Sequence, residues 1–592
     1  MNIYQHVRLA GLAVAVLGLS SCGGDDSAPP VSISFGTTPP SSLSVSSTAS
    51  MSALVTNDTH NAGVGWSVSC AAAACGTFNP NGTASGATTT YTPPATLPSP
   101  ATVTVTATAG ADHSKLVTAT INLTAAGAPL LADGTYVFHV NGNDGSGAYF
   151  LAGAFTVASG VITGGEQDYT DVVAGSHDPL LPQLCSLAAA GSSLQITLAT
   201  ANTNVGNGGI VVLRGTRVAQ TRVLVAEFDP SATAAGSVDL QTSAVFPGGG
   251  FAFGLRGIDT GNGAHLVIGG ILNFSGTALV PASSVFDLND GGSQLLRALT
   301  FSSGTVSAAD SYGRVSIDLV PASANLVPEF KLSAYVVGPG RLELIEDQSD
   351  DLNADLGGTA LGQGNNAGNF TLAGVAGTTY VHGLDGANGN GLAKLAGTFV
   401  LNADGTVGGT LALNDGVNFT GNNITGSYLV DPTGRVSLNN IQLSALNLTM
   451  VFQLYLDGNG NGIVAGIDNV EVSEGLAYTQ TATQPFGSSY AVNGQGILGS
   501  SGVWSAAGPV SIAAGSLTGS TDYNNNGTLV SATPLTGTQD SGNALFHLTG
   551  LDGDNFTTAT AWNYYPIDNS RALAIELDGQ MLGLIMLEAV TP

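Results

Sequence analysis

The sequence predicts an all-β protein, with one β-sandwich followed by four repeated antiparallel β-barrel or β-sandwich modules. Apolar and polar residues alternate in short runs such as Val103-Thr-Val-Thr-Ala107, and this period of two is typical of half-buried strands. Gly is abundant, with 82 residues in a chain of 592. The sequence contains no capped amphipathic helix of useful length. A set of features also recurs at intervals of about a hundred residues, which indicates repeated modules.

The composition indicates a folded, acidic protein that does not bind nucleic acid. Charged residues make up 9% of the chain, against roughly 25% in an average globular protein. Hydrophobic residues make up 43%, which argues against disorder. The net charge is −28, from 13 basic and 41 acidic residues. Nucleic acid is bound through Lys and Arg that neutralise its phosphates, so we exclude it as a partner.

The N-terminus has the features of an export signal. An apolar run of eleven residues, from Leu9 to Leu19, is too short to span a bilayer, which needs about 20 residues. It ends in Leu19-Ser20-Ser21-Cys22, which resembles the lipobox of bacterial lipoproteins. That resemblance implies removal of residues 1–21 and acylation of Cys22, so that membrane lipid is a partner. The alternative is an ordinary signal peptide with an incidental Cys.

The resemblance also implies a location in the cell envelope. Two or three acyl chains make anchoring stable where one would be marginal. Residues 22–30, rich in Gly, Asp and Pro, are expected to form a flexible tether. Gly23 follows the lipidated Cys, where an Asp would act as an inner-membrane retention signal. We therefore expect the outer membrane rather than the inner one, with the modules facing either the cell surface or the periplasm.

The other cysteines agree with export. Cys70 and Cys75 bracket four Ala residues and can close a disulfide in an oxidising compartment. A metal site at this pair is disfavoured, because no second Cys or His pair accompanies it. Cys185 is left over, and we expect a buried thiol there.

Residues 31–125 are predicted to form the β-sandwich. Trp66-Ser-Val-Ser-Cys70 reads as a strand, and Tyr91-Thr92-Pro93-Pro94 precedes a hairpin-like end between Thr102 and Leu123. This order resembles the bacterial Ig-like domains of surface proteins. The disulfide would be local, whereas the antibody pattern joins two sheets.

Four repeats are predicted after the sandwich, at residues 130–242, 243–363, 364–482 and 483–592. Each has a Gly-containing strand, then an Asp in a turn-like context, and three of them end in a Gly…Gln pattern. The Gly anchors are Gly153, Gly270, Gly397 and Gly502, the Asp residues are Asp168, Asp287, Asp415 and Asp522, and the Gln residues are Gln241, Gln363 and Gln480. The repeats resemble the β-modules of large bacterial surface lipoproteins. A single transmembrane β-barrel is the alternative, disfavoured by an aromatic content of 6% and by the lipobox.

One segment has the spacing of a calcium loop. Oxygen-bearing side chains stand at positions 1, 3, 5 and 12 of it, with Gly at position 6. These four residues are Asp457, Asn459, Asn461 and Asp468. Asn-Gly and Asp-Gly are also the commonest hairpin turns, so a simple turn without calcium is the alternative. No other cofactor is expected.

The sequence lacks the usual catalytic motifs, including Gly-x-Ser-x-Gly and His-Glu-x-x-His. We therefore expect a non-enzymatic, lipid-anchored protein of the cell envelope that serves adhesion, a structural role or ligand binding, with a cell-surface glycan or protein as partner. A glycan-binding lipoprotein is one alternative, in which Trp504, Trp562 or Tyr564 would stack on sugars; packing of these residues in the core is the competing interpretation. An envelope enzyme with a site not visible in the sequence is the second alternative.

Overall fold

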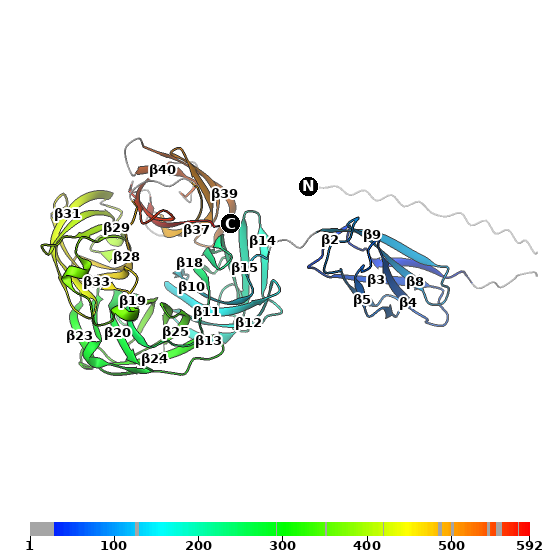
Figure 1. The fold of residues 1–592 in the computed structure, drawn as a ribbon, viewed down its shortest axis with the longest axis horizontal. Coiled ribbons are helices and arrows are strands. Elements are labelled where there is room, and N and C mark those ends of the chain that lie inside the picture. Colours follow the sequence, from blue (N-terminus) through cyan, green and yellow to red (C-terminus); the bar gives the residue numbers. More distant parts are fainter. Residues whose placement is uncertain are drawn as a thin grey trace, which may run out of the picture. The chain divides into compact units, whose positions relative to one another are not determined.

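The computed structural model describes residues 29–124, 129–291, 293–347, 349, 352–417, 419–482, 488–498, 502–540, 545–551, 559–577, 579 and 581–591. The signal peptide, Cys22 and the tether up to residue 28 lie outside the described residues. The chain divides into two compact units, residues 1–129 and 130–592. Nearly all regular structure is β in both of them, which confirms the predicted fold class (Figure 1).

The first unit is a two-sheet β-sandwich. One sheet contains, in spatial order, β1 (Ser32–Thr37), β3 (Ala49–Thr56), β7 (Thr88–Thr92) and β5 (Thr77–Asn79). The other contains β2 (Ser42–Ser44), β9 (Leu116–Thr124), β8 (Thr102–Ala109), β4 (Val64–Ser69) and β6 (Gly82–Thr83). Along β8 every second residue is buried, as its alternation predicted. Met51, Trp66 and Tyr91 lie in the core between the sheets. Cys70 and Cys75 form the predicted disulfide.

The second unit contains four antiparallel β-modules. Module 1 comprises β10 (Gly134–Asp144), β11 (Ala148–Ala158), β12 (Val161–Asp171), β13 (Gly175–Pro179), β14 (Ser186–Ala190), β15 (Ser193–Ala199), β16 (Ile210–Ala219), β17 (Arg222–Glu227) and β18 (Ala232–Leu240). Module 2 comprises β19 (Gly249–Asp259), β20 (His265–Ser275), β21 (Ala278–Leu279), β22 (Val285–Asp290), β23 (Gln294–Val306), β24 (Arg314–Pro321), β25 (Phe330–Gly338), β26 (Arg341–Glu346) and β27 (Ala354–Gly362).

Modules 3 and 4 are closed barrels of eight strands each. Module 3 comprises β28 (Thr379–Asn388), β29 (Gly391–Leu401), β30 (Thr406–Asn414), β31 (Phe419–Val430), β32 (Arg435–Leu443), β33 (Leu448–Leu456), β34 (Asn461–Gly466) and β35 (Glu471–Thr479). Module 4 comprises β36 (Ser488–Leu498), β37 (Gly502–Ala513), β38 (Ser516–Asn525), β39 (Thr528–Gln539), β40 (Leu545–Thr549), β41 (Thr560–Pro566), β42 (Arg571–Glu576) and β43 (Met581–Ala589). Module 2 closes through pairing of β19 with β20, and module 1 is a nine-stranded sheet.

Each module has its own apolar core, so the alternative of one large barrel is not what the chain forms. The first strand of module 1 shows how the sequence builds both the core and the contacts outside it. Tyr136, Phe138 and Val140 point into the core of module 1, because alternate residues of a strand face one side. Val137 faces outward and joins an apolar cluster with residues of module 2. The outward face is therefore buried between modules.

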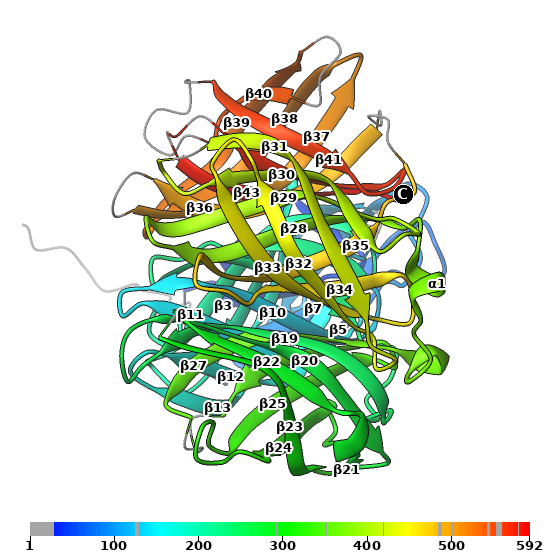
Figure 2. The same cartoon turned by 90° about the vertical axis from the view of Figure 1, so that its left-hand side faces the viewer.

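The four modules form a closed ring. In each of the first three modules, the second strand packs against a strand near the end of the next module. The pairs are β11 with β26, β20 with β34, and β29 with β42. The ring closes where β37 of module 4 packs against β17 of module 1. The modules follow one another around a common centre in Figure 1, and Figure 2 shows module 3 in front, with module 4 above it and module 2 below.

Short linker contacts repeat around the ring. The Gln side chains of the Gly…Gln pattern cross to the next module, where the Gln241 amide donates to the carbonyl oxygens of Tyr312 and Val336 at 2.8 and 2.7 Å. After module 1 the amide of Thr242 donates to the Val337 carbonyl at 2.7 Å. After module 4 the amide of Thr591 donates to the Val218 carbonyl at 2.7 Å. The same contact thus links the last module back to the first.

Strand register corrects two details of the repeat pattern. Phe138, Phe253 and His382 pair with Gly153, Gly270 and Gly397, and the equivalent Val492 pairs with Gly508 rather than with Gly502. In three modules, the residue before this Gly pairs with the recurring Asp, which is Asp168, Asp287 or Asp522. In module 3 it pairs with Ala412, so Asp415 is not the equivalent Asp. Local similarity of Gly-rich segments misplaced these two positions.

Helical structure is minor in the described part of the chain. It consists of the 3-10 turns η1 (Pro281–Ser283) and η2 (Gly364–Asn366) and one four-residue helix, α1 (Leu372–Val375). Within the described ranges, no helix has the length and apolar character needed to cross a membrane.

Candidate functional site

The candidate site lies where the first strands of the four modules meet. Near the middle of each of these strands, a polar residue precedes a Gly. The pairing of the first strand with the last strand of the module shows that the four positions are equivalent. These residues are Asn141, Arg256, Asp385 and Gln495. The Gly is required by close approach, because a Cβ at Gly257 or Gly496 would lie 1.8 Å from a carbonyl oxygen of the neighbouring strand.

The four polar side chains are connected in a closed circuit, which we call the axial girdle. Arg256 donates a hydrogen bond to the Asn141 side-chain oxygen, and its Nη1 lies 3.1 Å from Asp385 Oδ2. Gln495 Nε2 donates to Asn141 Oδ1 at 3.0 Å and to Asp385 Oδ2 at 3.4 Å. Lys394 Nζ lies 2.5 Å from the second oxygen of Asp385. All four modules therefore contribute one member of the girdle.

Two cavities adjoin the girdle, and both are lined by Asn141, Arg256 and Asp385. The larger has a volume of about 400 Å³ and the smaller about 250 Å³. His139 lines the smaller cavity and Asn143 the larger, so the cavities lie on opposite sides of Asn141 along β10. The lining of the larger cavity includes the exposed Ser146. These cavities we call the larger and smaller axial cavities.

Burial and ion pairing set the charges around the girdle. Burial would raise the pKa of Asp385, but Lys394 and Arg256 outweigh it and hold this pKa at about 2. Burial raises the pKa of Glu474, in the smaller cavity, to about 7. Burial also lowers the pKa of His265, in the larger cavity, which favours its neutral form. The Asp385 carboxylate is thus shared by two cations.

Basic residues are concentrated between modules. Residues 130–592 contain eleven Lys and Arg residues, which is few enough for each position to be informative. Four of them line the axial cavities, namely Arg222, Arg256, Arg341 and Lys394. Four more contact the adjoining module, namely Arg214, Arg297, Arg314 and Arg435. Most of the positive charge of the ring is therefore used at its axis and at its internal interfaces.

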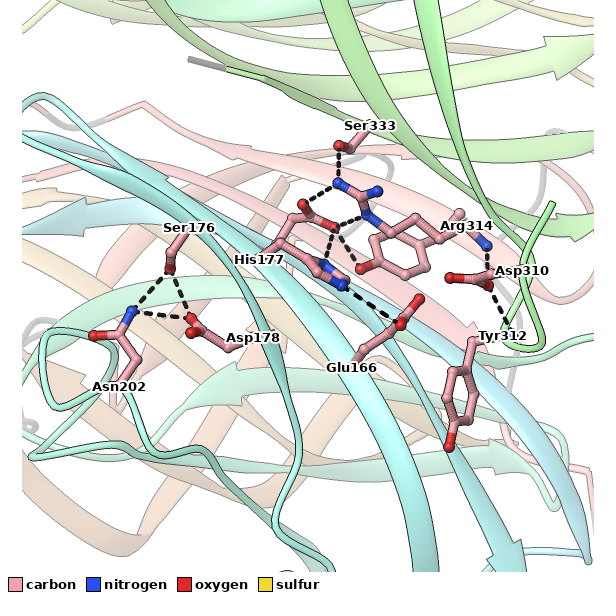
Figure 3. Close-up of polar contacts among 11 residues, drawn as sticks. Glu166, Ser176, His177, Asp178, Asn202, Asp310, Tyr312, Arg314 and Ser333 are labelled. Carbon is pink, nitrogen blue, oxygen red and sulfur yellow. Dashed lines mark hydrogen bonds and ion pairs between the residues drawn. The ribbon is translucent and has the colours of Figure 1, made fainter. Parts of the chain in front are cut away.

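A buried ion pair holds modules 1 and 2 together (Figure 3). Arg314 Nε and Nη2 donate to the two oxygens of Asp168 at 2.6 and 2.7 Å, and Tyr335 donates to the same carboxylate at 2.5 Å. Asp287 has equivalent contacts from Arg435 at 2.7 Å and from Tyr455 at 2.7 Å between modules 2 and 3.

The other two interfaces use different chemistry at this position. Between modules 3 and 4, Ala412 and Tyr565 belong to a buried apolar cluster. Between modules 4 and 1, Asp522 Oδ1 lies 3.6 Å from Arg214 Nη1. The acid is thus replaced by Ala at the interface where an apolar cluster takes over the contact.

Asn side chains add a second recurring contact. The Asn524 amide donates to three backbone carbonyl oxygens of module 1, those of Glu227, Asp229 and Ala232, at 2.8 to 3.1 Å. Asn289 and Asn414 contact the next module in the same way. Each of these Asn residues is buried, so they fix the orientation of one module on the next.

His177, whose side chain is 41% exposed, and the buried Glu166 adjoin the Asp168 carboxylate (Figure 3). His177 Nδ1 lies 3.3 Å from Asp168 Oδ2, and its Nε2 lies 3.7 Å from Glu166 Oε2. The Asp168 hydrogen bond raises the pKa of His177. Burial, followed by the contact with Asp310, raises the pKa of Glu166 to about 8. Arg314 and Tyr335 also contact the Asp168 carboxylate, so these side chains form one cluster at the interface of modules 1 and 2.

The structure brings three of the four predicted calcium ligands, Asp457, Asn459 and Asn461, together in one connection and places Asp468 apart from them. Asp457 lies in the turn between β33 and β34, where its Oδ1 accepts the amides of Asn459 and Asn461 at 2.7 Å each. Asp468 follows the other end of β34, about 17 Å of extended chain away, and accepts the amides of Val470 and Glu471. Within the described ranges, no group of three or more His, Cys, Asp or Glu residues is arranged to hold a metal ion.

The aromatic residues of the glycan-binding alternative lie in the core of module 4. Trp504 and Trp562 are fully buried and Tyr564 is 4% exposed, so stacking of these rings on a surface glycan is ruled out. Trp504 packs against Tyr523 and Trp562. Cys185, expected to be a buried thiol, is half-buried. Cys22 lies outside the described residues.

Comparison with known proteins adds no further identification. No family model, curated protein or solved structure matches this chain. The sequence reasoning also missed the axial girdle. The one available signal was the polar residue that precedes Gly in each repeat, as Asn141-Gly142, Arg256-Gly257, Asp385-Gly386 and Gln495-Gly496, because such dipeptides resemble turns.

Proposed function

We propose that this protein is a lipid-anchored protein of the bacterial cell envelope whose ring binds a small molecule in the larger axial cavity without catalysing a reaction. The observation that carries this proposal is the closed ring, which leaves a cavity of about 400 Å³ at its axis. Ligand sites are typically clefts of roughly 300–1,000 Å³ at domain interfaces, with apolar walls and a few converging polar groups. The larger cavity has these properties.

The polar groups at the cavity support binding rather than catalysis. Asp385, the one carboxylate among the described residues that line the larger cavity, is held by Lys394 and Arg256, which keeps it ionised and occupied. A general base, in contrast, needs a pKa near the working pH and access to a proton. Adhesion through a glycan-stacking surface has less support, because the large aromatics of module 4 are in its core.

The sequence supports the location in the envelope. The apolar run of residues 9–19 and the Leu19-Ser20-Ser21-Cys22 motif imply export and acylation of Cys22. The Cys70–Cys75 disulfide is in keeping with an oxidising compartment outside the cytoplasm. The tether would then hold the modules at a membrane surface.

Fluorescence of N-phenylnaphthylamine, a neutral aromatic probe, tests the binding function. The probe is titrated into the full chain carrying Cys22→Ala, which removes the predicted lipidation. We expect saturable binding that Leu392→Trp reduces by about tenfold or more, because Leu392 lines the cavity and is 39% exposed, so a larger side chain fills space there. Leu429→Trp, at a 68% exposed position of the same module, is the matched control. Binding that is absent, or equal in both variants, would refute the function.

The location is tested separately with a C-terminal tag and protease on intact and lysed cells. Fractionation of the Cys22→Ala variant serves as the control. Membrane association that is lost in Cys22→Ala is the expected result. Tag cleavage on intact cells would indicate surface display, and protection until lysis would indicate the periplasm. Membrane association that persists in Cys22→Ala would contradict the anchor.

A further inference from the structure

We propose, on the basis of the binding function above, that the larger axial cavity takes an organic anion with one acidic group and an apolar body. The acidic group would contact Arg256 and Lys394, and the apolar body would occupy the rest of the cavity.

The charge balance of the lining favours an anion. Among the described residues that line the larger cavity, Arg256 and Lys394 are cationic and Asp385 is the one carboxylate. The net charge there is therefore +1, in a chain whose net charge is −28. His265, also in the lining, is kept neutral because burial lowers its pKa. A monoanionic ligand would neutralise the remaining positive charge.

Glu474 does not cancel this positive charge fully. Its carboxyl lies in the smaller axial cavity, beyond Arg256, and burial raises its pKa to about 7. A carboxyl with that pKa holds its proton on about half of the molecules at neutral pH. Glu474 is itself 7% exposed, so solvent gives its charged form little stabilisation. Asp385 is therefore the main counter-charge to the two cations.

The cations retain hydrogen-bonding capacity for a ligand. An ammonium has three N–H donors and a guanidinium has five. Asp385 accepts from Lys394 and from Arg256, and Asn141 accepts from Arg256. Lys394 is 4% exposed, and a buried ammonium is stabilised by each acceptor it gains. A carboxylate or similar oxyanion supplies two or more acceptors at once.

The walls of the larger cavity favour an apolar body. Beyond the girdle the lining includes the side chains of Phe150, Val172, Ile258, Leu392, Ile497 and Val503. They come from all four modules, so the ligand would contact several modules at once. Burial of apolar ligand surface contributes about 25 cal/mol per Å². A polyhydroxylated sugar would leave hydroxyl groups unpaired against these walls, which is costly.

Calorimetric titration with three matched probes tests the inference. The probes are phenylbutyrate, phenylbutyramide and phenylbutylamine, which share one apolar body and differ in the charge of the head group. The protein is the full chain carrying Cys22→Ala. We expect phenylbutyrate to bind about tenfold or more tightly than the neutral amide, and the amine to bind most weakly.

Variants of the cations complete the test. Lys394→Met should lower the affinity for phenylbutyrate about tenfold and leave the amide unaffected, while Lys394→Arg, which retains the charge, should keep the preference for the anion. Lys331→Met, on β25 and outside both cavity linings, is the control and should change nothing. If Lys394→Met does not fold, the three probes are compared on the unmodified cavity and on Lys394→Arg. These comparisons still test whether the cavity prefers the anion.

The outcomes separate this inference from the binding function. If the amide or the amine binds as tightly as phenylbutyrate, the anion proposal is overturned and the binding function stands. The same holds if none of the three probes binds while N-phenylnaphthylamine binds in a way that Leu392→Trp weakens. If N-phenylnaphthylamine also fails to bind, the binding function fails with it.

Discussion

Replacement of Asp168 by Ala tests whether the buried ion pairs hold the ring together. The Asp168 side chain is 9% exposed and the Arg314 side chain 19%, so solvent screens this pair weakly. Asp168→Ala removes the acceptor of two Arg314 hydrogen bonds and of the Tyr335 hydroxyl. Arg314 then stays between modules 1 and 2 without its counter-charge.

The expected cost follows from the state of Arg314 after the change. Removal of one partner of a buried ion pair costs about 3–5 kcal/mol, mostly through the charge left unpaired. Ser333 still accepts a hydrogen bond from Arg314 at 2.7 Å, so we expect the lower end, about 3 kcal/mol. Hydrogen exchange of the β11 and β26 amides is the assay, with urea unfolding alongside, because four modules do not guarantee a single transition.

A paired variant supplies the control and the refutation. Between modules 3 and 4, Ala412 lies in an apolar cluster, so this architecture tolerates an interface without the acid. Asp168→Ala combined with Arg314→Met should therefore regain most of the stability that Asp168→Ala loses, since apolar groups can replace a buried ion pair without loss. The reasoning is refuted if the single change costs less than about 1 kcal/mol, or if the paired variant is no more stable than the single one.

Three further predictions concern the interfaces and ring closure. The pKa of Glu166 is raised to about 8, so the folded state holds this proton more tightly than the unfolded state; the stability from this group is present below its ordinary pKa and is lost as pH rises toward the folded value. As pH rises from about 5 to about 8, the urea midpoint of Glu166→Gln should therefore fall less than that of the unmodified chain. Parallel pH profiles of the two midpoints would contradict this. Asn524→Leu removes the amide that donates to three backbone carbonyl groups of module 1 and should cost about 2–4 kcal/mol, measured as faster exchange of the β17 and β18 amides; unchanged exchange there would count against the role of Asn524. Thr591→Pro removes the amide that donates to Val218 and should destabilise the contact of module 4 with module 1 by about 1–2 kcal/mol, seen as faster exchange in β16. The comparison is Thr242→Pro, the same change between modules 1 and 2, and a silent Thr591→Pro beside a disruptive Thr242→Pro would show that the ring does not depend on this closure.

The strands and the repeats could be predicted from the sequence because they depend on local periodicity. Alternation of apolar residues gave the fold class, and the recurring Asp168, Asp287 and Asp522 are equivalent in the structure. The calcium spacing did not predict that Asp468 lies apart from the other three residues. It counts residues along a loop, whereas β34 carries Asp468 away from Asp457, and spacing alone does not show that a strand intervenes.

The ring and its axial girdle could not be predicted in the same way. Contacts between modules join residues more than a hundred positions apart, such as Arg314 with Asp168, and no local pattern encodes such a pairing. The girdle positions carry four different residue types, so they form no repeated motif. Val137 shows why the contacts between modules are hard to predict. An outward-facing apolar residue on a strand indicates that another surface covers it, but it does not indicate which surface that is.

Because the four modules belong to one chain, the side chains at the axis of the ring do not have to obey fourfold symmetry. A ring of four identical subunits would place the same side chain at the axis four times, and four Asp385 or four Arg256 side chains would repel one another at such short range. One covalent chain removes that constraint, so each quarter of the ring can present a different group. The girdle of one cation, one anion and two amides is internally neutral, and this heterogeneity is open only to a pseudo-symmetric assembly. The axis can therefore recognise an asymmetric molecule in one orientation, where a strictly fourfold axis would offer four equivalent ones.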